Sequence, residues 1–101
     1  MRRGARPLRT PGNDGHRRDD IEPEIIDALR TCGASVTRMA IPGAPDLLVG
    51  FRRRTLLVEV KSSEGRLRPL QEKWIADWRG DDVHVVRSID DALKLLGVIA
   101  S

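Results

Sequence analysis

Apolar residues are almost absent from residues 1–20 and then recur with a helical period. The first stretch holds Gly, Pro, Arg, Asn and Asp, which is typical of a flexible basic arm. The helical positions that follow are Ile21, Ile25, Ala28, Leu29 and Cys32. Gly33 is placed to end this helix, Asp19 or Asp20 to cap its start, and Pro23 to lie in its first turn. The pattern predicts an arm, residues 1–20, and one folded domain, residues 21–101.

Short runs rich in Leu and Val follow, separated by turn residues. We expect strands at residues 35–39, 46–51 and 55–61, with the arginines between the last two at a hairpin tip. A helix should open at Pro69 and close at Gly80, a fourth strand should span residues 83–87, and a last helix should run from its cap Ser88 to Gly97. The order α-β-β-β-α-β-α predicts an α/β fold with a mixed sheet flanked by helices.

The helix after Pro69 carries two tryptophans four residues apart. This spacing places Trp74 and Trp78 on one stripe, and we interpret both as core residues rather than as platforms for stacked bases. Gln71 shares the stripe, where an amide needs a hydrogen-bonding partner. Two interpretations stay open for Gln71: it points to a functional site, or it bonds to backbone.

Alternation along the central hairpin places two carboxylates side by side. Leu56, Val58 and Val60 share one apolar face of their strand, which turns Glu59 and Lys61 to the other. The antiparallel register that keeps all aliphatic side chains together sets Asp46 opposite Glu59, since a slip by one residue would place charges in the core. Cross-strand neighbours lie about 5 Å apart. Two such anions repel unless a cation lies between them, and Lys61 or a divalent metal ion could be that cation.

The charge of the chain indicates what kind of molecule it binds, and its cysteine content indicates the redox state of its compartment. The net charge of the 101 residues is +3, and arginines gather in two blocks, one in the arm and one at Arg52, Arg53 and Arg54. Their planar groups suit phosphate, so a polyanionic partner is favoured, although a solvated basic surface would have the same composition. The single cysteine fits a reducing interior, and no apolar run is long enough to span a membrane.

The motif formed by Pro45-Asp46 and Glu59-Val60-Lys61 resembles the PD-(D/E)xK nuclease signature. A closer likeness is to the VRR-NUC domain, whose members look like "GxPDLLV…LLVEVKS…GRLxPLQxxW…VxVVRSxDDAL". The matching residues are 43–50, 56–63, 65–74 and 83–93. Glu22, followed by Leu29, Gly33 and Arg38, is similar to archaeal-type Holliday junction resolvases of the same superfamily. The resemblance covers nearly everything after the arm and implies a restriction-endonuclease-like fold.

The resemblance also implies a site. Asp46, Glu59 and the Val60 carbonyl would bind Mg²⁺, for which Mn²⁺ would substitute, and Lys61 would be the catalytic lysine. Glu22 would be the first-helix metal ligand, with Glu24 as its competitor, and Gln71 would match the family's glutamine. The arginines that would contact DNA are Arg38, Arg52, Arg53, Arg54, Arg66 and Arg68.

Function follows from the same likeness as an expectation. The implied activity is hydrolysis of phosphodiester bonds that leaves a 5′-phosphate, and branched DNA is the expected substrate. Symmetric cutting of a four-way junction takes two active sites, so we expect a homodimeric Holliday junction resolvase, in the cytoplasm of a bacterial or virus-infected cell. Two alternatives remain: a broader nuclease for flaps, forks or single strands, and a non-catalytic DNA-binding module.

Overall fold

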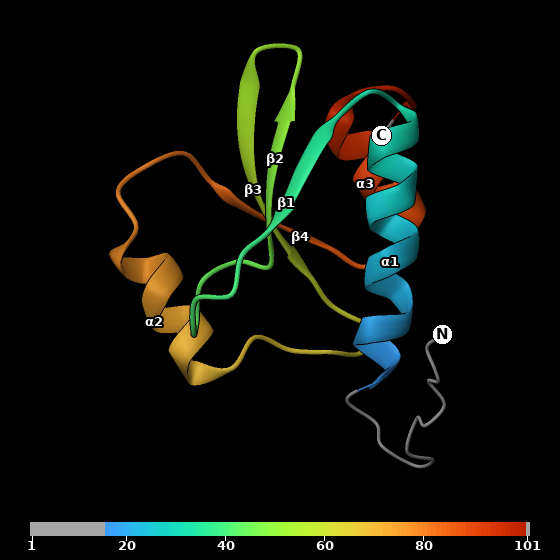
Figure 1. Ribbon diagram of the computed structural model, residues 1–101. Helices are drawn as coiled ribbons and strands as arrows, with labels where there is room; N and C mark the ends of the chain where they lie inside the picture. The colour runs from blue at the N-terminus through green and yellow to red at the C-terminus, as the bar shows by residue number, and fades with distance from the viewer. Residues whose placement is uncertain (1–15, 101) are drawn as a thin grey trace.

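Three helices and four strands follow one another in the order α-β-β-β-α-β-α (Figure 1). The computed structural model describes residues 16–100, with side chains from residue 21 onward. Its elements are α1 (His16–Thr31), β1 (Ser35–Arg38), β2 (Leu47–Phe51), β3 (Arg54–Val60), α2 (Pro69–Asp77), β4 (Val83–Val86) and α3 (Ile89–Leu96). The predicted α/β class and element order are confirmed. Among these helices, none has the length and apolar content that crossing a bilayer requires.

The four strands form one mixed sheet in the order β1-β2-β3-β4. The pairs β1–β2 and β2–β3 are antiparallel, whereas β4 joins β3 in parallel after the α2 crossover. Leu48 pairs with Leu57, which is the register that the apolar pattern predicts. Continued by one residue beyond the ladder, this register sets Asp46 opposite Glu59.

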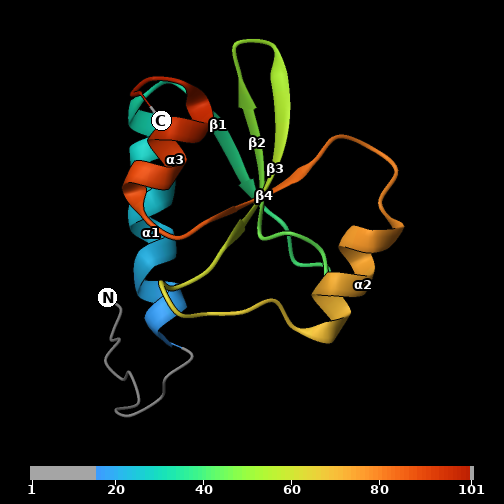
Figure 2. The same ribbon diagram turned by 180° about the vertical axis from the view of Figure 1, so that it is seen from behind.

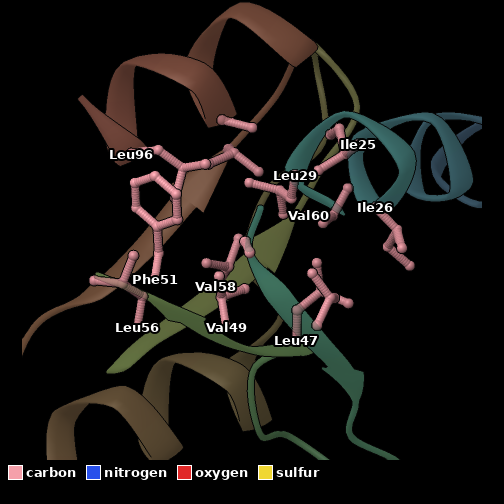
Figure 3. Packing of buried hydrophobic residues seen from close by; sticks show 14 residues of the cluster. Ile25, Ile26, Leu29, Leu47, Val49, Phe51, Leu56, Val58, Val60 and Leu96 are labelled. Carbon is pink, nitrogen blue, oxygen red and sulfur yellow. The ribbon is translucent and has the colours of Figure 1, made fainter. Parts of the chain in front are cut away.

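Helices α1 and α3 pack side by side on one face of the sheet (Figures 1 and 2). The apolar side chains on the inner side of the central hairpin are buried beneath them: Leu47, Val49 and Phe51 in β2, and Leu56, Val58 and Val60 in β3. Figure 3 shows these side chains converging with Ile25 and Leu29 of α1 and Leu96 of α3. Each fully buried aliphatic side chain contributes about 1.5–3 kcal/mol, so this layer accounts for most of the hydrophobic stabilisation of the fold.

The prediction that Trp74 and Trp78 are core residues is wrong. Helix α2 lies on the other side of the sheet (Figures 1 and 2) and contains no buried residue. It ends at Asp77 rather than near Gly80, so Trp78 is its extended C-cap and leaves the helical stripe. The Trp78 side chain is 42% exposed, stacks on Trp74 with ring centroids 4.9 Å apart, and donates its indole N–H to the Asp81 carbonyl.

Helix α1 begins earlier than the sequence pattern indicates. It starts at His16, so Pro23 lies inside the helix and not in its first turn. Proline has no N–H to donate to the carbonyl four residues back, and polar residues precede it, which is why the pattern predicts a start near Ile21. Residues 1–15 of the predicted arm lie outside the described residues. At its other end the helix is closed, as predicted, by Gly33 with a φ of 99°.

The hairpin between β2 and β3 turns through two arginines. Arg52 and Arg53 have φ angles of 50° and 67°, the left-handed geometry of a tight two-residue turn. Such turns favour Asn-Gly, and an L-residue there costs roughly 1–2 kcal/mol. The Arg52 guanidinium lies 4.7 Å from the centroid of the Phe51 ring, a cation–π contact that offsets part of this strain.

Candidate active site

Asp46 lies just before β2, where the β2–β3 ladder ends. The last backbone pair is Leu47 with Val58, so the Val60 N–H extends past the ladder. The Asp46 carboxylate takes its place as acceptor, with Oδ2 2.9 Å from the Val60 nitrogen. Because the N–H and C=O of one strand residue point to the same side, the Val60 carbonyl also faces the side of Asp46. A carboxylate and a backbone carbonyl are thus turned to the same edge of the strand.

Glu59 and Lys61 form a buried ion pair on the sheet face that bears α2. Their side chains are 2% and 5% exposed, and Lys61 Nζ lies 3.4 Å from Glu59 Oε2. The sequence pattern places both residues on this face, at the charged end of β3. Removing two opposite charges from water is costly, and the Coulomb attraction compensates only when further hydrogen bonds satisfy the pair.

Gln71 supplies those hydrogen bonds from α2. Its Nε2 donates to Glu59 Oε2 at 2.7 Å, and its Oε1 accepts from Lys61 Nζ at 2.9 Å. The same Oε1 accepts from the Arg68 backbone N–H at 2.8 Å. Of the two interpretations of Gln71, the contact with Glu59 and Lys61 therefore holds, together with one backbone bond. The glutamine fixes the lysine and the glutamate relative to each other.

Arg87, which the site prediction missed, holds the loop that joins β3 to α2. Its Nη1 donates to the carbonyls of Ser62 and Gly65 at 2.8 and 2.6 Å. Its backbone N–H donates to the Asp91 carboxylate at the start of α3. Lys61 and Gln71 lie at the two ends of this loop, so Arg87 sets the distance that the Lys61–Gln71 contact requires. The only sequence signal was its position at the end of a strand within the motif shared with VRR-NUC domains.

For the phosphodiester hydrolysis that the sequence resemblance implies, we expect Arg87→Ala to lower the turnover of the chemical step by about a hundredfold while the KM for DNA changes little. The reason is that the loop would displace Lys61 and Gln71 without removing a DNA contact. Arg87→Lys keeps one charged donor and should recover part of the loss. Single-turnover cleavage assays measure both. Val36→Ala, which shortens a buried core side chain beneath α1, is the control for general destabilisation. If Val36→Ala lost as much turnover as Arg87→Ala, the positioning role of Arg87 would be contradicted.

The first-helix acid predicted as a metal ligand has a different partner. Glu22 Oε2 lies 3.4 Å from the Arg38 Nε, and the Glu22 side chain is 13% exposed, whereas Glu24 is exposed to solvent. Glu22, and not Glu24, is thus turned towards the protein. Among residues whose side chains are described, no three acids gather closely enough to hold a metal ion together. The structure brings Asp46, Glu59, Val60, Lys61 and Gln71 together and leaves Glu22 beside Arg38.

The predicted DNA-contacting arginines fall into two groups. Arg38 ends β1 beside Glu22, and Arg66 and Arg68 lie in the loop between β3 and α2. All three are exposed at the Asp46 end of the sheet. The hairpin arginines 52–54 lie at the opposite end of β2 and β3, which five strand residues place roughly 17 Å away. They are not part of the site.

The donor set fits a small, hard divalent cation. Asp46, Glu59 and the Val60 carbonyl offer oxygen only, and Mg²⁺ is typically held by one or two carboxylates with water in the remaining positions. The absence of a third gathered acid is compatible with this preference, because Mg²⁺ retains several waters. Zn²⁺, which favours nitrogen and sulfur ligands, is a poorer match to these groups.

Two comparisons with known proteins identify the family of the chain. The family model for the VRR-NUC domain matches residues 9–88. A solved structure of a VRR-NUC domain is similar to the chain, with 26% identity and a TM-score of 0.64 over 80% of this chain and 95% of the other. The search of curated proteins gave no match.

Proposed function

Because this chain belongs to the VRR-NUC family of nuclease domains, we propose that it is a metal-dependent endonuclease that cuts branched DNA as a homodimer, with four-way junctions as its main substrate. The observation that carries this proposal is the geometry at the end of β3. There Asp46 bonds the amide of Val60, while Glu59 and Lys61 are joined through Gln71. Glu59 and Lys61 thus lie two residues apart, and Asp46 lies beside them, just before the neighbouring strand. These are the three charged residues of the PD-(D/E)xK motif.

In this proposal each residue has a distinct task. Lys61 presents a positive charge, held in place by Gln71, to the phosphate under attack or to the attacking water. Asp46 and Glu59 supply negative charge on either side of the Val60 carbonyl. The exposed Arg66 and Arg68 hold the neighbouring phosphates of the DNA backbone. The expected product is a 5′-phosphate and a 3′-hydroxyl end.

Asp46, Glu59 and the Val60 carbonyl would hold Mg²⁺, with Mn²⁺ as a substitute. The ion would supply Lewis acidity to the phosphodiester and neutralise the two carboxylates. Glu22 would join this set only after exchanging Arg38 for the ion or for a bound water. The chain's own contribution is to keep both carboxylates and Lys61 in place before DNA arrives.

Arginines near the site support recognition of shape rather than sequence. Contacts with phosphates position a protein on DNA but carry no base information. A four-way junction offers phosphates in an arrangement that linear duplex lacks, and resolving it takes two cuts related by symmetry. Two copies of the chain would supply the two active sites.

Cleavage of a matched set of labelled substrates tests this function. The set contains a four-way junction, a 5′ flap, a fork, a single strand and a linear duplex, each with Mg²⁺, with Mn²⁺ or with EDTA. Paired symmetric nicks in the junction, abolished by EDTA, are the expected result. Equal cutting of all branched and single-stranded substrates would replace the resolvase with a broader repair nuclease. Binding without cleavage in either metal would leave only a DNA-binding module.

A further inference from the structure

One face of the sheet carries apolar side chains that α2 does not cover. Leu48 and Leu57, paired across β2 and β3, lie on the face opposite α1 and α3, and Leu48 is 38% exposed. With Trp78 they border an open, mostly apolar hollow of about 270 Å³. Its lining residues are Leu48, Thr55, Leu57, Trp78, Asp81 and Asp82. We call this surface the outer-face hollow.

The outer face of the sheet carries leucines where a solvent-exposed face would carry polar residues. Two of the three strand pairs are antiparallel, and sheets of this kind can leave one face to solvent when its side chains are polar. Leu48 and Leu57 depart from that pattern. Here α1 and α3 lie on one face, while α2 lies beside the Asp46 end of the other (Figures 1 and 2). The hairpin end of that face, where the hollow lies, has no helix over it. Something apolar should therefore cover it.

Charge around the hollow argues against nucleic acid as the occupant. Asp81 and Asp82 stand on its rim, and a phosphate backbone laid across Leu48 and Leu57 would meet both carboxylates. An occupant with an apolar centre and a basic edge suits the hollow better, because positive groups could then reach Asp81 and Asp82 while leucine meets leucine.

The chain itself carries such a surface. Arg53 and Arg54 border a second hollow together with Asp81 and Asp82, immediately beside the outer-face hollow. Within the described side chains no ion pair joins these arginines to these aspartates. The two aspartates, the two leucines and the two arginines thus lie next to one another on one surface. Two copies related by a two-fold rotation could place the arginines of each copy against the aspartates of the other.

The strained turn points in the same direction. Arg53 adopts a φ of 67° at a position where glycine would cost less backbone strain. Strain of this kind persists where a side chain has a task. Since the turn lies roughly 17 Å from Asp46, that task is separate from cleavage.

We propose that a second copy of this chain docks on the outer-face hollow, with Arg53 and Arg54 of each copy against Asp81 and Asp82 of the other. This inference rests on the proposed dimeric nuclease and names its interface. Leu57 and Glu59 point from the same face of β3, about 7 Å apart along the strand. A two-fold axis near Leu57 would therefore bring the two copies of Glu59 close to that axis.

Exchange of charge between copies tests the interface. The first variant, Arg53→Glu with Arg54→Glu, makes the hairpin tip acidic; the second, Asp81→Arg with Asp82→Arg, makes the rim basic. Each alone brings like charges together at both ends of the interface, so the dissociation constant of the dimer should rise at least about a hundredfold. An equimolar mixture restores opposite charges in every contact and should form a heterodimer. Sedimentation velocity of the full chain measures all three.

The controls and outcomes separate this inference from the proposed function. Glu24→Arg and Lys94→Glu reverse exposed charges on α1 and α3 and should leave the dimer intact. If both test variants remain dimers, the interface is elsewhere and the nuclease proposal stands. If wild type is monomeric with and without junction DNA, the interface and the dimeric resolvase fail together. If each variant alone is monomeric and their mixture also stays monomeric, the proposed pairing of Arg53 and Arg54 with Asp81 and Asp82 is wrong.

Loss of folding is checked independently. Far-UV circular dichroism of each variant should match wild type, and nicking of a flap, which takes one active site, should persist in the monomers. Leu48→Gln, a change at a single exposed side chain, serves as a second route to the same test. It should weaken the dimer about tenfold with no effect on the circular dichroism, and an unweakened dimer would count against the hollow as the contact.

Discussion

Asp46→Asn should lower the rate of phosphodiester cleavage by about a thousandfold or more and leave the fold intact. The amide oxygen of asparagine can still accept the Val60 N–H that Asp46 Oδ2 accepts at 2.9 Å. The substitution therefore removes one negative charge and little else. In the proposed mechanism, a site without that charge would hold a divalent cation poorly and would lose the polarisation of the phosphodiester.

Single-turnover cleavage of a four-way junction in Mg²⁺ measures the rate, and binding to the same junction in Ca²⁺ measures affinity. Affinity should stay within about twofold of wild type, because the proposed contacts with phosphates come from Arg66 and Arg68 rather than from Asp46. Asp77→Asn is the matched control: the same chemical change on an exposed carboxylate whose partner among the described side chains is Lys73. Cleavage by Asp46→Asn at more than a tenth of the wild-type rate would contradict the proposed role of Asp46.

Lys61→Met should abolish detectable cleavage and also lower the free energy of unfolding by about 3 kcal/mol. The second effect arises because Glu59, 2% exposed, stays buried after losing the ammonium 3.4 Å away. Catalytic lysines on a solvated surface show no such penalty. The size of the stability loss thus reports how far the pair is withdrawn from water.

A double variant separates the two effects of Lys61. Glu59→Gln with Lys61→Met removes both charges and keeps similar volumes, so most of the lost stability should return while cleavage stays absent. Urea denaturation at a fixed protein concentration measures the three free energies. If Lys61→Met were as stable as wild type, the buried-pair description would be wrong, whatever happened to activity.

The hairpin register could be predicted because one side of the strands is wholly apolar. Val58 and Val60 must face the core, and this requirement alone sets Leu48 against Leu57 and brings Asp46 to the edge of β3. The placement of Glu59 and Lys61 on one face followed from the same alternation. For this part of the site, local periodicity and the cost of burying charge were sufficient.

Other features depend on contacts between distant segments. The stripe on α2 suggested a buried helix, but the chain leaves the helix at Asp77 and Trp78 remains 42% exposed. Nothing in the local sequence of α2 reveals how much of the sheet it covers. Arg87 was missed for the same reason: its two carbonyl partners lie 22 and 25 residues earlier in the chain.

Val60 belongs both to the hydrophobic core and to the candidate active site. Its side chain is fully buried beneath α1, while its N–H holds the carboxylate of Asp46. If heat loosens the packing around the Val60 side chain, the Val60 N–H should move too and displace the Asp46 carboxylate. No loop lies between the core and the candidate site at this point. Activity and folding should be lost over the same temperature range, so a substitution that stabilises the core should also raise the temperature at which activity is lost.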